Sequence, residues 1–196
     1  MFVQIITGTV TDPQTFLREG ERWGKEVRPN AIGYLGGVWG LTSDGRGLAV
    51  GQFESEQAAQ ANSTRPEQGE WWTSMEKAFS DVTFVDCSDT DVMGEGIATA
   101  AGFAQVIQGR VKDQGATKAM MRENEEELRA GRPDILGGLM AWHGTDGTFT
   151  QVMFFRSEAD ARSGEKAMES QDVGRQYQEM MATAPTFIDL PEPHFD

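Results

Sequence analysis

The chain repeats itself, and this repeat constrains the fold more than any other feature of the sequence. Residues 2–12 and 103–113 both carry Phe, Gln, Ile, Gly, Val and Asp at every second position, at an offset of 101 residues. Successive side chains of a β-strand point to opposite faces, so identity at alternate positions is expected when one face does the same work in two related strands. The pattern predicts that one structural unit occurs twice.

The similarity continues in the same order along both halves of the chain. The offset changes by only a few residues from one match to the next, as expected where loops accept insertions. We therefore predict a tandem duplication, with a first repeat at residues 1–88, a linker at 89–102 and a second repeat at 103–196. The further matches pair residues 29–33 with 133–137, 44–45 with 146–147, 53–56 with 155–158, and 83–84 with 186–187.

Each repeat has the order β-α-β-β-α-β, which is that of a ferredoxin-like unit. Asp12-Pro13 and Asp113 are expected to cap a first helix, and Ser55 and Ser157 a second helical region, while the two Asp-Gly pairs signal hairpins. We predict an α+β fold with antiparallel sheets. The expected strands are 2–10, 31–40, 47–54, 82–87, 103–111, 135–143, 148–156 and 186–190, and the expected helical regions are 13–27, 55–79, 114–130 and 157–182.

A ferredoxin-like sheet carries helices on one face and leaves the other face bare. Two such units can bring their bare faces together as a barrel of eight strands, which encloses side chains or one small ligand. We therefore expect a pseudo-dimer, an intramolecular dimeric α/β-barrel, and leave further oligomerisation open. The linker 89–102 is small and polar and is expected to be a connector. Its Gly94-Glu95-Gly96 lacks the third glycine of a dinucleotide-binding fingerprint.

Charge and composition exclude several classes of function. The formal net charge is −14, spread over both repeats, so the chain should repel nucleic acid and anionic membrane surfaces. The single cysteine, Cys87, rules out an internal disulfide and a thiolate-rich metal site. No apolar run approaches the roughly 20 residues of a membrane span, and residues 1–8 read as a strand rather than a signal peptide. A cytoplasmic protein is the expectation.

These motifs resemble the dimeric α/β-barrel superfamily, and within it the antibiotic-biosynthesis monooxygenase-like group. The resemblance covers nearly the whole chain, twice. It rests on the first strand with its helix, the Pro-x-x-x-Gly segments, the Asp-Gly hairpins, and residues 53–59 and 155–161, which look like the family's aromatic-x-Ser-x-x-Ala signature. The resemblance implies a ferredoxin-like fold and a small-molecule ligand. The family includes cofactor-free monooxygenases, haem-degrading enzymes and isomerases.

One departure from the family pattern bears on the chemistry. Many members carry a histidine early in the second helix, after the signature. Here that place falls at Asn62 in the first repeat and near Gly164 in the second. Neither residue can ligate haem iron or transfer a proton at neutral pH, so haem chemistry of that type is disfavoured. We expect neither a metal nor a cofactor.

Two polar residues of the second repeat are the candidate catalytic groups. His143 ends the second expected strand, where it aligns with Trp39, and could act as a general base at a barrel mouth. The alternative is a histidine that faces solvent at a strand end, and His194 is expected to be exposed in the tail. Gln105 lies among apolar residues in mid-strand and could orient a ligand carbonyl or dioxygen. The alternative is a structural amide.

The candidate ligand-binding residues are Gln4, the counterpart of Gln105, and the tryptophans Trp39, Trp72 and Trp142. Flat aromatic surfaces suit a planar substrate, although most buried tryptophans only pack. Seven of the ten methionines lie in the second repeat, where we expect them to fill the core.

The sequence contains no phosphate loop, Gly-x-Ser-x-Gly or His-Glu-x-x-His motif. An enzyme built from these residues would rely on cavity shape, amides and aromatic rings. The sequence therefore favours a small-molecule-binding protein that acts as a cofactor-independent monooxygenase on an electron-rich aromatic or quinol substrate. The alternative is a non-catalytic ligand carrier or a duplicated scaffold whose sites have decayed. The residues also favour two unlike cavities in the two halves.

Overall fold

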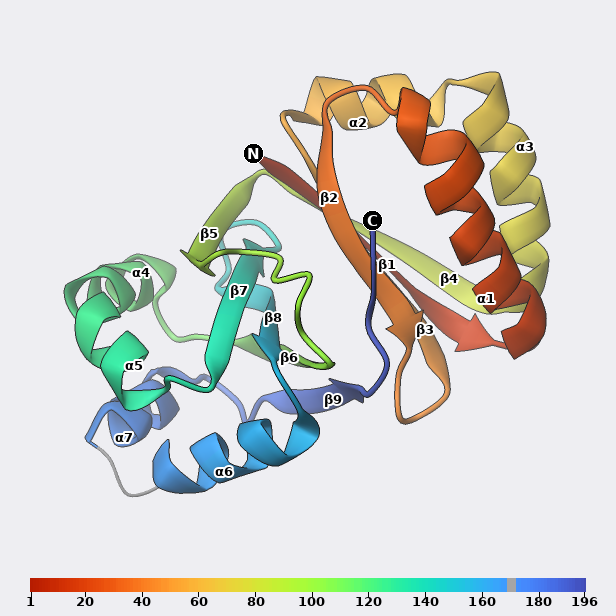
Figure 1. The fold of residues 1–196 in the computed structure, drawn as a ribbon. Helices are drawn as coiled ribbons and strands as arrows, with labels where there is room; N and C mark the ends of the chain where they lie inside the picture. The colour runs from red at the N-terminus through yellow and green to blue at the C-terminus, as the bar shows by residue number, and fades with distance from the viewer. Residues whose placement is uncertain (169–171) are drawn as a thin grey trace. The chain divides into compact units, whose positions relative to one another are not determined.

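The computed structural model describes residues 1–168 and 172–196, and these form two compact units. Unit 1 comprises residues 1–90 with 192–196, and unit 2 comprises residues 91–191. Each unit is built from one five-stranded sheet and its helices (Figure 1). The chain is thus α+β, with two ferredoxin-like antiparallel sheets as predicted, although each sheet has five strands rather than four.

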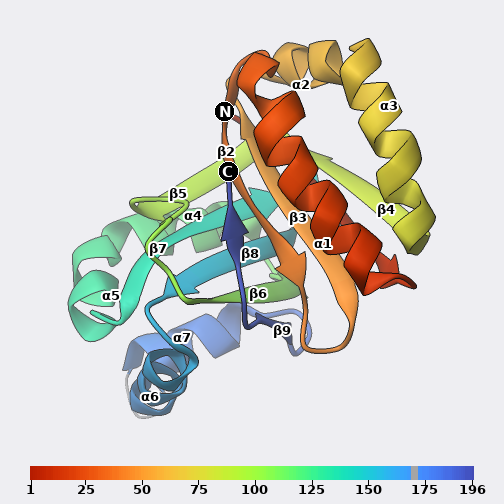
Figure 2. The ribbon, with the colours of Figure 1, turned by 45° about the vertical axis from the view of Figure 1, so that its right-hand side comes forward.

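The sheet of unit 1 has the strand order β10-β2-β3-β1-β4. Figure 2 shows helices α1 and α3 side by side over one face of this sheet. The strands are β1 (Phe2–Val10), β2 (Tyr34–Leu41), β3 (Arg46–Phe53), β4 (Phe79–Cys87) and β10 (His194–Phe195), and the helices are α1 (Pro13–Arg22), α2 (Glu56–Ser63) and α3 (Pro66–Met75). A π-helical turn at Trp23–Val27 and short 3-10 turns at Arg28–Asn30 and Glu76–Ala78 complete the helical segments.

The sheet of unit 2 has the corresponding order β5-β7-β8-β6-β9. The strands are β5 (Asp89–Gly94), β6 (Phe103–Arg110), β7 (Ile135–Trp142), β8 (Thr148–Phe155) and β9 (Thr186–Leu190). The helices are α4 (Gln114–Glu123), α5 (Glu125–Gly131), α6 (Glu158–Met168) and α7 (Asp172–Met180). Part of the predicted helical region 157–182 falls on residues 169–171, outside the described residues.

The fifth strand of each sheet comes from outside the repeat that supplies the other four. Strand β10 follows β9 along the chain but pairs with β2 of unit 1, through His194 opposite Trp39 and Phe195 opposite Val38. Strand β5 follows β4 but lies beside β7 in unit 2. The segment expected to be a plain connector therefore contains a strand, and the tail expected to be exposed is a strand whose His194 is half-buried. A compact unit is consequently not identical to a sequence repeat.

Local signals in the sequence explain where the elements begin and turn. The side chains of Asp12, Asp113 and Ser55 each accept a hydrogen bond from a backbone N–H of the first helical turn, which satisfies a donor that has no intrahelical partner. Pro13 and Pro66 occupy first helical positions, where the missing N–H costs nothing. Gly45 adopts a φ of +80° in the β2–β3 hairpin, a conformation that favours glycine.

Strands β2 and β7 correct one part of the repeat alignment. Tyr34 pairs with Phe53 in unit 1, and Ile135 pairs with Phe155 in unit 2. Because Phe53 and Phe155 are equivalent, Tyr34 corresponds to Ile135, at an offset of 101. The predicted alignment of residues 29–33 with 133–137 was wrong by three residues. The first and second strands keep the same offset of 101 residues, so the two connections are equally long and the Pro-x-x-x-Gly match does not mark equivalent positions.

The same register changes which residue of the second repeat corresponds to Trp39. Counting along the two strands from their first residues, Trp39 corresponds to Met140 and Leu41 to Trp142. The predicted equivalence of Trp39 with His143 was therefore wrong. His143 instead corresponds to Thr42, since each donates its backbone N–H across the hairpin, to Thr148 and Arg46 respectively.

Among the described residues, no helix is long and apolar enough to cross a membrane.

Candidate functional site

Unit 1 contains a cavity of about 110 Å³ between the helix-bearing face of its sheet and helices α1 and α3. Residues of β1, β2 and β3 form its floor, and residues of α1, the π-helical turn and α3 form its roof. Almost all of the surface that faces the cavity is apolar. Every lining residue belongs to unit 1, with Asp196 of the exchanged tail among them.

Small residues provide the space. Gly20 of α1 and Ala49 and Gly51 of β3 line the cavity where longer side chains would fill it. At Gly20 an added Cβ would meet the indole of Trp39 at 2.4 Å, so this glycine allows the Trp39 ring to lie against the helix backbone. At Gly51 the nearest contacts of an added Cβ would be at 3.4 Å, an ordinary van der Waals distance. The glycine at position 51 therefore leaves space that the fold itself does not require.

Tryptophans of two helical segments form much of the roof. Trp71 donates its indole N–H to the backbone carbonyl of Glu19 at 2.8 Å, and Trp23 donates to the Gln68 side chain at 3.0 Å. Because these N–H groups already have partners, both rings are held in place. Trp72 packs against Trp71, with ring centroids 5.7 Å apart. The cavity is therefore bounded by oriented aromatic surfaces.

One cluster of polar groups, from β2 and from the tail at residues 192–196, lines part of the cavity. The Asp196 carboxyl group lies beside the polar groups of the Trp39 and Tyr34 side chains. Burial raises the pKa of Asp196 above its usual range, and the nearby Trp39 and Tyr34 side chains and the charges of Arg28 and His194 only partly offset this. Burial and the adjacent Asp196 together raise the pKa of Tyr34, so its hydroxyl keeps its proton.

A second polar group is the Gln4 amide of β1. Its Nε2 donates to Asp86 of β4 at 2.9 Å, and Gln4 also lines the cavity. The structure thus brings three of the predicted ligand-binding residues, Gln4, Trp39 and Trp72, around one cavity. Their role in binding a ligand remains a prediction.

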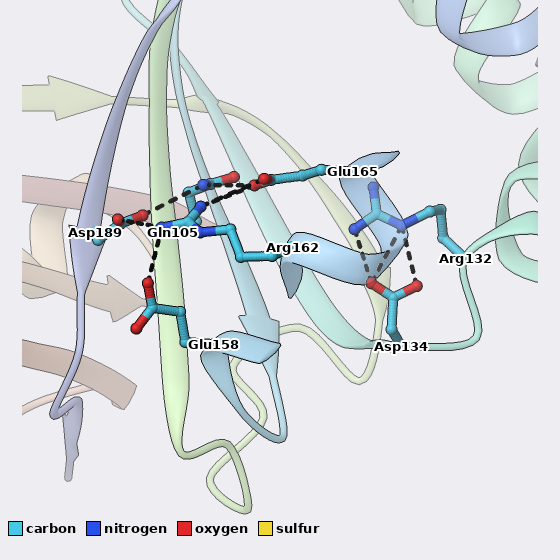
Figure 3. A network of polar contacts seen from close by, with 7 residues as sticks. All are labelled: Gln105, Arg132, Asp134, Glu158, Arg162, Glu165 and Asp189. Carbon is cyan, nitrogen blue, oxygen red and sulfur yellow. Dashed lines mark hydrogen bonds and ion pairs between the residues drawn. The ribbon is translucent and has the colours of Figure 1, made fainter. Parts of the chain in front are cut away.

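Gln105, the counterpart of Gln4, lies in a denser polar network. Figure 3 shows its amide donating to Glu165 of α6 at 2.8 Å and to Asp189 of β9 at 3.3 Å, with Arg162 bonded to both carboxylates. Arg162 also contacts Glu158 at 3.2 Å. Gln105 is only 3% exposed. Its partners match the structural alternative that the sequence left open, because a buried amide is stabilised when its hydrogen bonds are satisfied.

His143 and Trp142 lie elsewhere in unit 2. The His143 ring is 3.0 Å from the Thr150 hydroxyl, and burial lowers the pKa of His143. Trp142 donates to Asp91 at 2.8 Å and packs against Phe149, one residue before Thr150. Because neighbouring residues of a strand point to opposite faces, Trp142 and His143 point to opposite faces of this sheet.

Gln105 also lies on the face opposite to His143. Gln105 pairs with Met153, which shares its face with Phe149 and Gln151, whereas His143 contacts Thr150 on the other face. The structure therefore does not bring the two candidate catalytic residues together.

Sequence reasoning missed Tyr34 and Asp196. Tyr34 is an aromatic residue at the start of a strand, a position that usually signals packing only. Asp196 lies in a short tail whose strand pairing no local pattern indicates. Asn62 is fully engaged with the backbone, donating to the carbonyls of Ile32 and Ala58 and accepting from the Ile32 N–H. Cys87 is buried, and burial raises its pKa to about 11, as expected for a packing thiol.

Among the described residues, no group of three or more His, Cys, Asp or Glu side chains is arranged to hold a metal ion.

Comparisons with known proteins place the fold. No family model matches the chain, and no curated protein matches it. A candidate monooxygenase from Fusobacterium nucleatum superposes with a TM-score of 0.81 at 11% identity, over 100% of this chain and 93% of that chain. A candidate monooxygenase from Lactobacillus acidophilus gives 0.73 at 14% identity, over 96% and 92%. An anthrone oxidase-like protein gives 0.67 at 15% identity, over 100% and 92%.

At such low identities the similarity establishes the fold and nothing finer. It extends over both units, since the matches cover nearly the whole chain. The chain therefore shares the ferredoxin-like α+β fold of these structures, with the unit present twice in one polypeptide.

Proposed function

We propose that the cavity of unit 1 binds one ring of an electron-rich aromatic compound, and that the chain acts on it as a cofactor-independent monooxygenase. The observation that carries this proposal is the aromatic cavity, which is bounded by oriented rings and bordered by the polar side chains of Tyr34 and Asp196. Pockets of this kind, mostly apolar with a few convergent polar groups, are the usual form of small-molecule sites.

The size of the cavity limits the ligand. A cavity of about 110 Å³ is smaller than the roughly 300–1,000 Å³ of pockets that enclose drug-sized ligands. It is comparable with the roughly 150 Å³ engineered cavity that binds benzene. One ring of a quinol or a phenol therefore fits, and a larger polycyclic compound would have to extend beyond the cavity. We propose a single-ring quinol as the simplest substrate.

The proposed reaction needs no electrons from the protein. A quinol and dioxygen give a hydroxyquinone and water, so that one oxygen atom enters the ring and the other leaves as water. The quinol supplies all the electrons, and the chain has to bind the ring, exclude bulk water and accept the proton of its hydroxyl group. The three structures described above share the fold, and two are described as candidate monooxygenases and one as anthrone oxidase-like, which favours this reaction class.

The test uses a substitution that fills the cavity with a methionine. Gly51→Met introduces the residue found at the equivalent Met153, and Gly69→Met is the control because Gly69 is exposed and an added Cβ there meets nothing within 4 Å. Methylhydroquinone is titrated against tryptophan fluorescence, and oxygen uptake above the rate of autoxidation is followed with an electrode. We expect saturable binding and uptake, both reduced at least about tenfold in Gly51→Met and unchanged in the control.

Equal binding by wild type and Gly51→Met would show that the cavity is not the site. Saturable binding without oxygen uptake would replace the monooxygenase with a ligand carrier. If ¹⁸O₂ labels no oxygen of the hydroxyquinone, the oxygenation step is wrong even if oxygen is consumed.

A further inference from the structure

Asp196 is distant in sequence from the rest of unit 1 but is anchored firmly beside the cavity. Its backbone N–H donates to Gly37 of β2 at 3.3 Å, just after the two β10 residues that pair with the same strand. The preceding His194 stacks on the Trp39 indole, with ring centroids 4.3 Å apart and planes inclined by 15°. The tail is therefore positioned by both its backbone and its side chains, and Asp196 lines the cavity.

Within the described part of the chain, the carboxyl group of Asp196 lies at the cavity without a close cation. Tyr34 and Trp39, which also line the cavity, are its polar neighbours. Within residues 1–168 and 172–196, no lysine or arginine forms an ion pair with it, although Arg28 and His194 act on it electrostatically, and His194 in turn faces Glu21. Burial and these neighbours leave a carboxylate that is less acidic than an exposed aspartate and borders an apolar cavity.

We infer that Asp196 is the proton acceptor for the hydroxyl group of the bound aromatic ring. This inference rests on the proposed function, since it names the group that ionises the same substrate. In the step, the proton of the ring O–H passes to the Asp196 carboxylate, leaving an aryloxide anion and a neutral carboxylic acid. The aryloxide is the electron-rich species that dioxygen then oxidises. Proton transfer to a positioned side chain contributes about 10²–10⁴ in rate in known enzymes.

Within the described residues of unit 2, no carboxylate occupies the position equivalent to Asp196. Asp196 lies six residues after Leu190, and the residue six after the equivalent Cys87 is Met93, which packs into the core of unit 2. The nearest acidic counterpart, Asp91, also accepts from an indole, that of Trp142. Asp91, however, forms ion pairs with Lys118 at 3.2 Å and Arg122 at 3.8 Å. A carboxylate paired with two cations is a weaker base, so we place the acceptor in unit 1 only.

The decisive variant is Asp196→Asn in the full chain, with Glu192→Gln as the control because Glu192 is an exposed carboxylate in the same tail. With methylhydroquinone, Asp196→Asn should bind within about threefold of wild type but consume oxygen about 100-fold more slowly. In wild type the rate should fall as the pH is lowered through the pKa of Asp196, and this fall should be absent in the variant. A variant that keeps both the rate and the acid limb overturns the inference.

A second measurement does not depend on turnover. Bound 4-nitrophenol reports its ionisation through its visible absorbance. An Asp196 carboxylate beside the phenol oxygen accepts a hydrogen bond from the neutral O–H group and repels the phenolate anion. The bound probe should therefore ionise about one pH unit higher in wild type than in Asp196→Asn. Identical ionisation curves would overturn the inference even if oxygen is consumed. A shifted ionisation curve without oxygen uptake would support Asp196 as the proton acceptor and would contradict only the proposed monooxygenase activity.

Discussion

The two units share a strand order but differ in how they fill the space between sheet and helices. In unit 1, Gly20, Ala49 and Gly51 leave a cavity. The equivalent positions in unit 2 carry larger side chains. They are Met121, Gln151 and Met153 respectively. The position equivalent to Trp39 is occupied by Met140.

The polar side chains around the Gln–Asp pair are likewise packed more densely in unit 2 than in unit 1. The Gln–Asp pair between the first and last strands of the repeat is present in both units, as Gln4–Asp86 and Gln105–Asp189. Only in unit 2 do an arginine and a glutamate from a helix close around it. One unit thus has space beside this amide, whereas the other surrounds the equivalent amide with packed and ion-paired side chains.

The largest expected difference between the two units is tested by placing alanine at one pair of equivalent positions, Met153 in unit 2 and Gly51 in unit 1. Met153→Ala removes a buried side chain from the core of unit 2 and should lower the free energy of unfolding by about 2–5 kcal/mol. Gly51→Ala should change it by less than about 1 kcal/mol, because the added Cβ meets only ordinary contacts. Calorimetric unfolding of both variants measures the difference. Equal costs would mean that the two positions are packed alike.

The amides provide the next largest contrast. Gln105→Leu should destabilise the protein by about 2 kcal/mol, because a buried donor to two carboxylates is lost. Gln4→Leu should cost less than about 1 kcal/mol, since its side-chain hydrogen bond to Asp86 is exposed to solvent. Urea titration of the two variants under identical conditions compares them. A larger cost at Gln4 than at Gln105 would contradict the structural role assigned to the unit 2 network.

The smallest expected effect concerns the contact between Gly20 and Trp39. Gly20→Ala should displace the indole, with a net loss of about 1 kcal/mol, because overpacking is partly offset by the better helix propensity of alanine. The displaced ring should also lose its stacking on His194. Near-ultraviolet circular dichroism reports the change in tryptophan environment. An unaltered spectrum would show that the ring does not depend on the glycine.

Much of the fold could be predicted from the repeat. Alternation in β1 and β6, the caps at Asp12 and Asp113, and the Asp-Gly hairpins are local signals, and the structure contains the corresponding elements. The register of β2 could not be predicted from the Pro-x-x-x-Gly match, because the two motifs occupy different positions in connections of equal length, whereas the strand pairing fixes an offset of 101 residues. A short local match identifies an element well but does not fix its register.

The site was predicted only in part, for a physical reason. Gln4, Trp39 and Trp72 could be selected because polar or large aromatic residues in apolar elements are conspicuous in the sequence. Whether they face a cavity depends on glycines at other positions, and whether Gln105 is free depends on Glu165 sixty residues away. Asp196 could not be selected, because its place is set by strand pairing between distant segments.

The exchange of β5 and β10 has a consequence for protein engineering. A chimera that joins the first repeat of this chain to the second repeat of a homologue, cut near residue 102, would keep the aromatic walls of the cavity but inherit a foreign tail in place of Asp196. The unit that recombines intact comprises residues 1–90 together with 192–196. Selection acting on the cavity therefore acts on two segments that are far apart in the sequence, so substitutions at Trp39 and within residues 192–196 should covary among homologues.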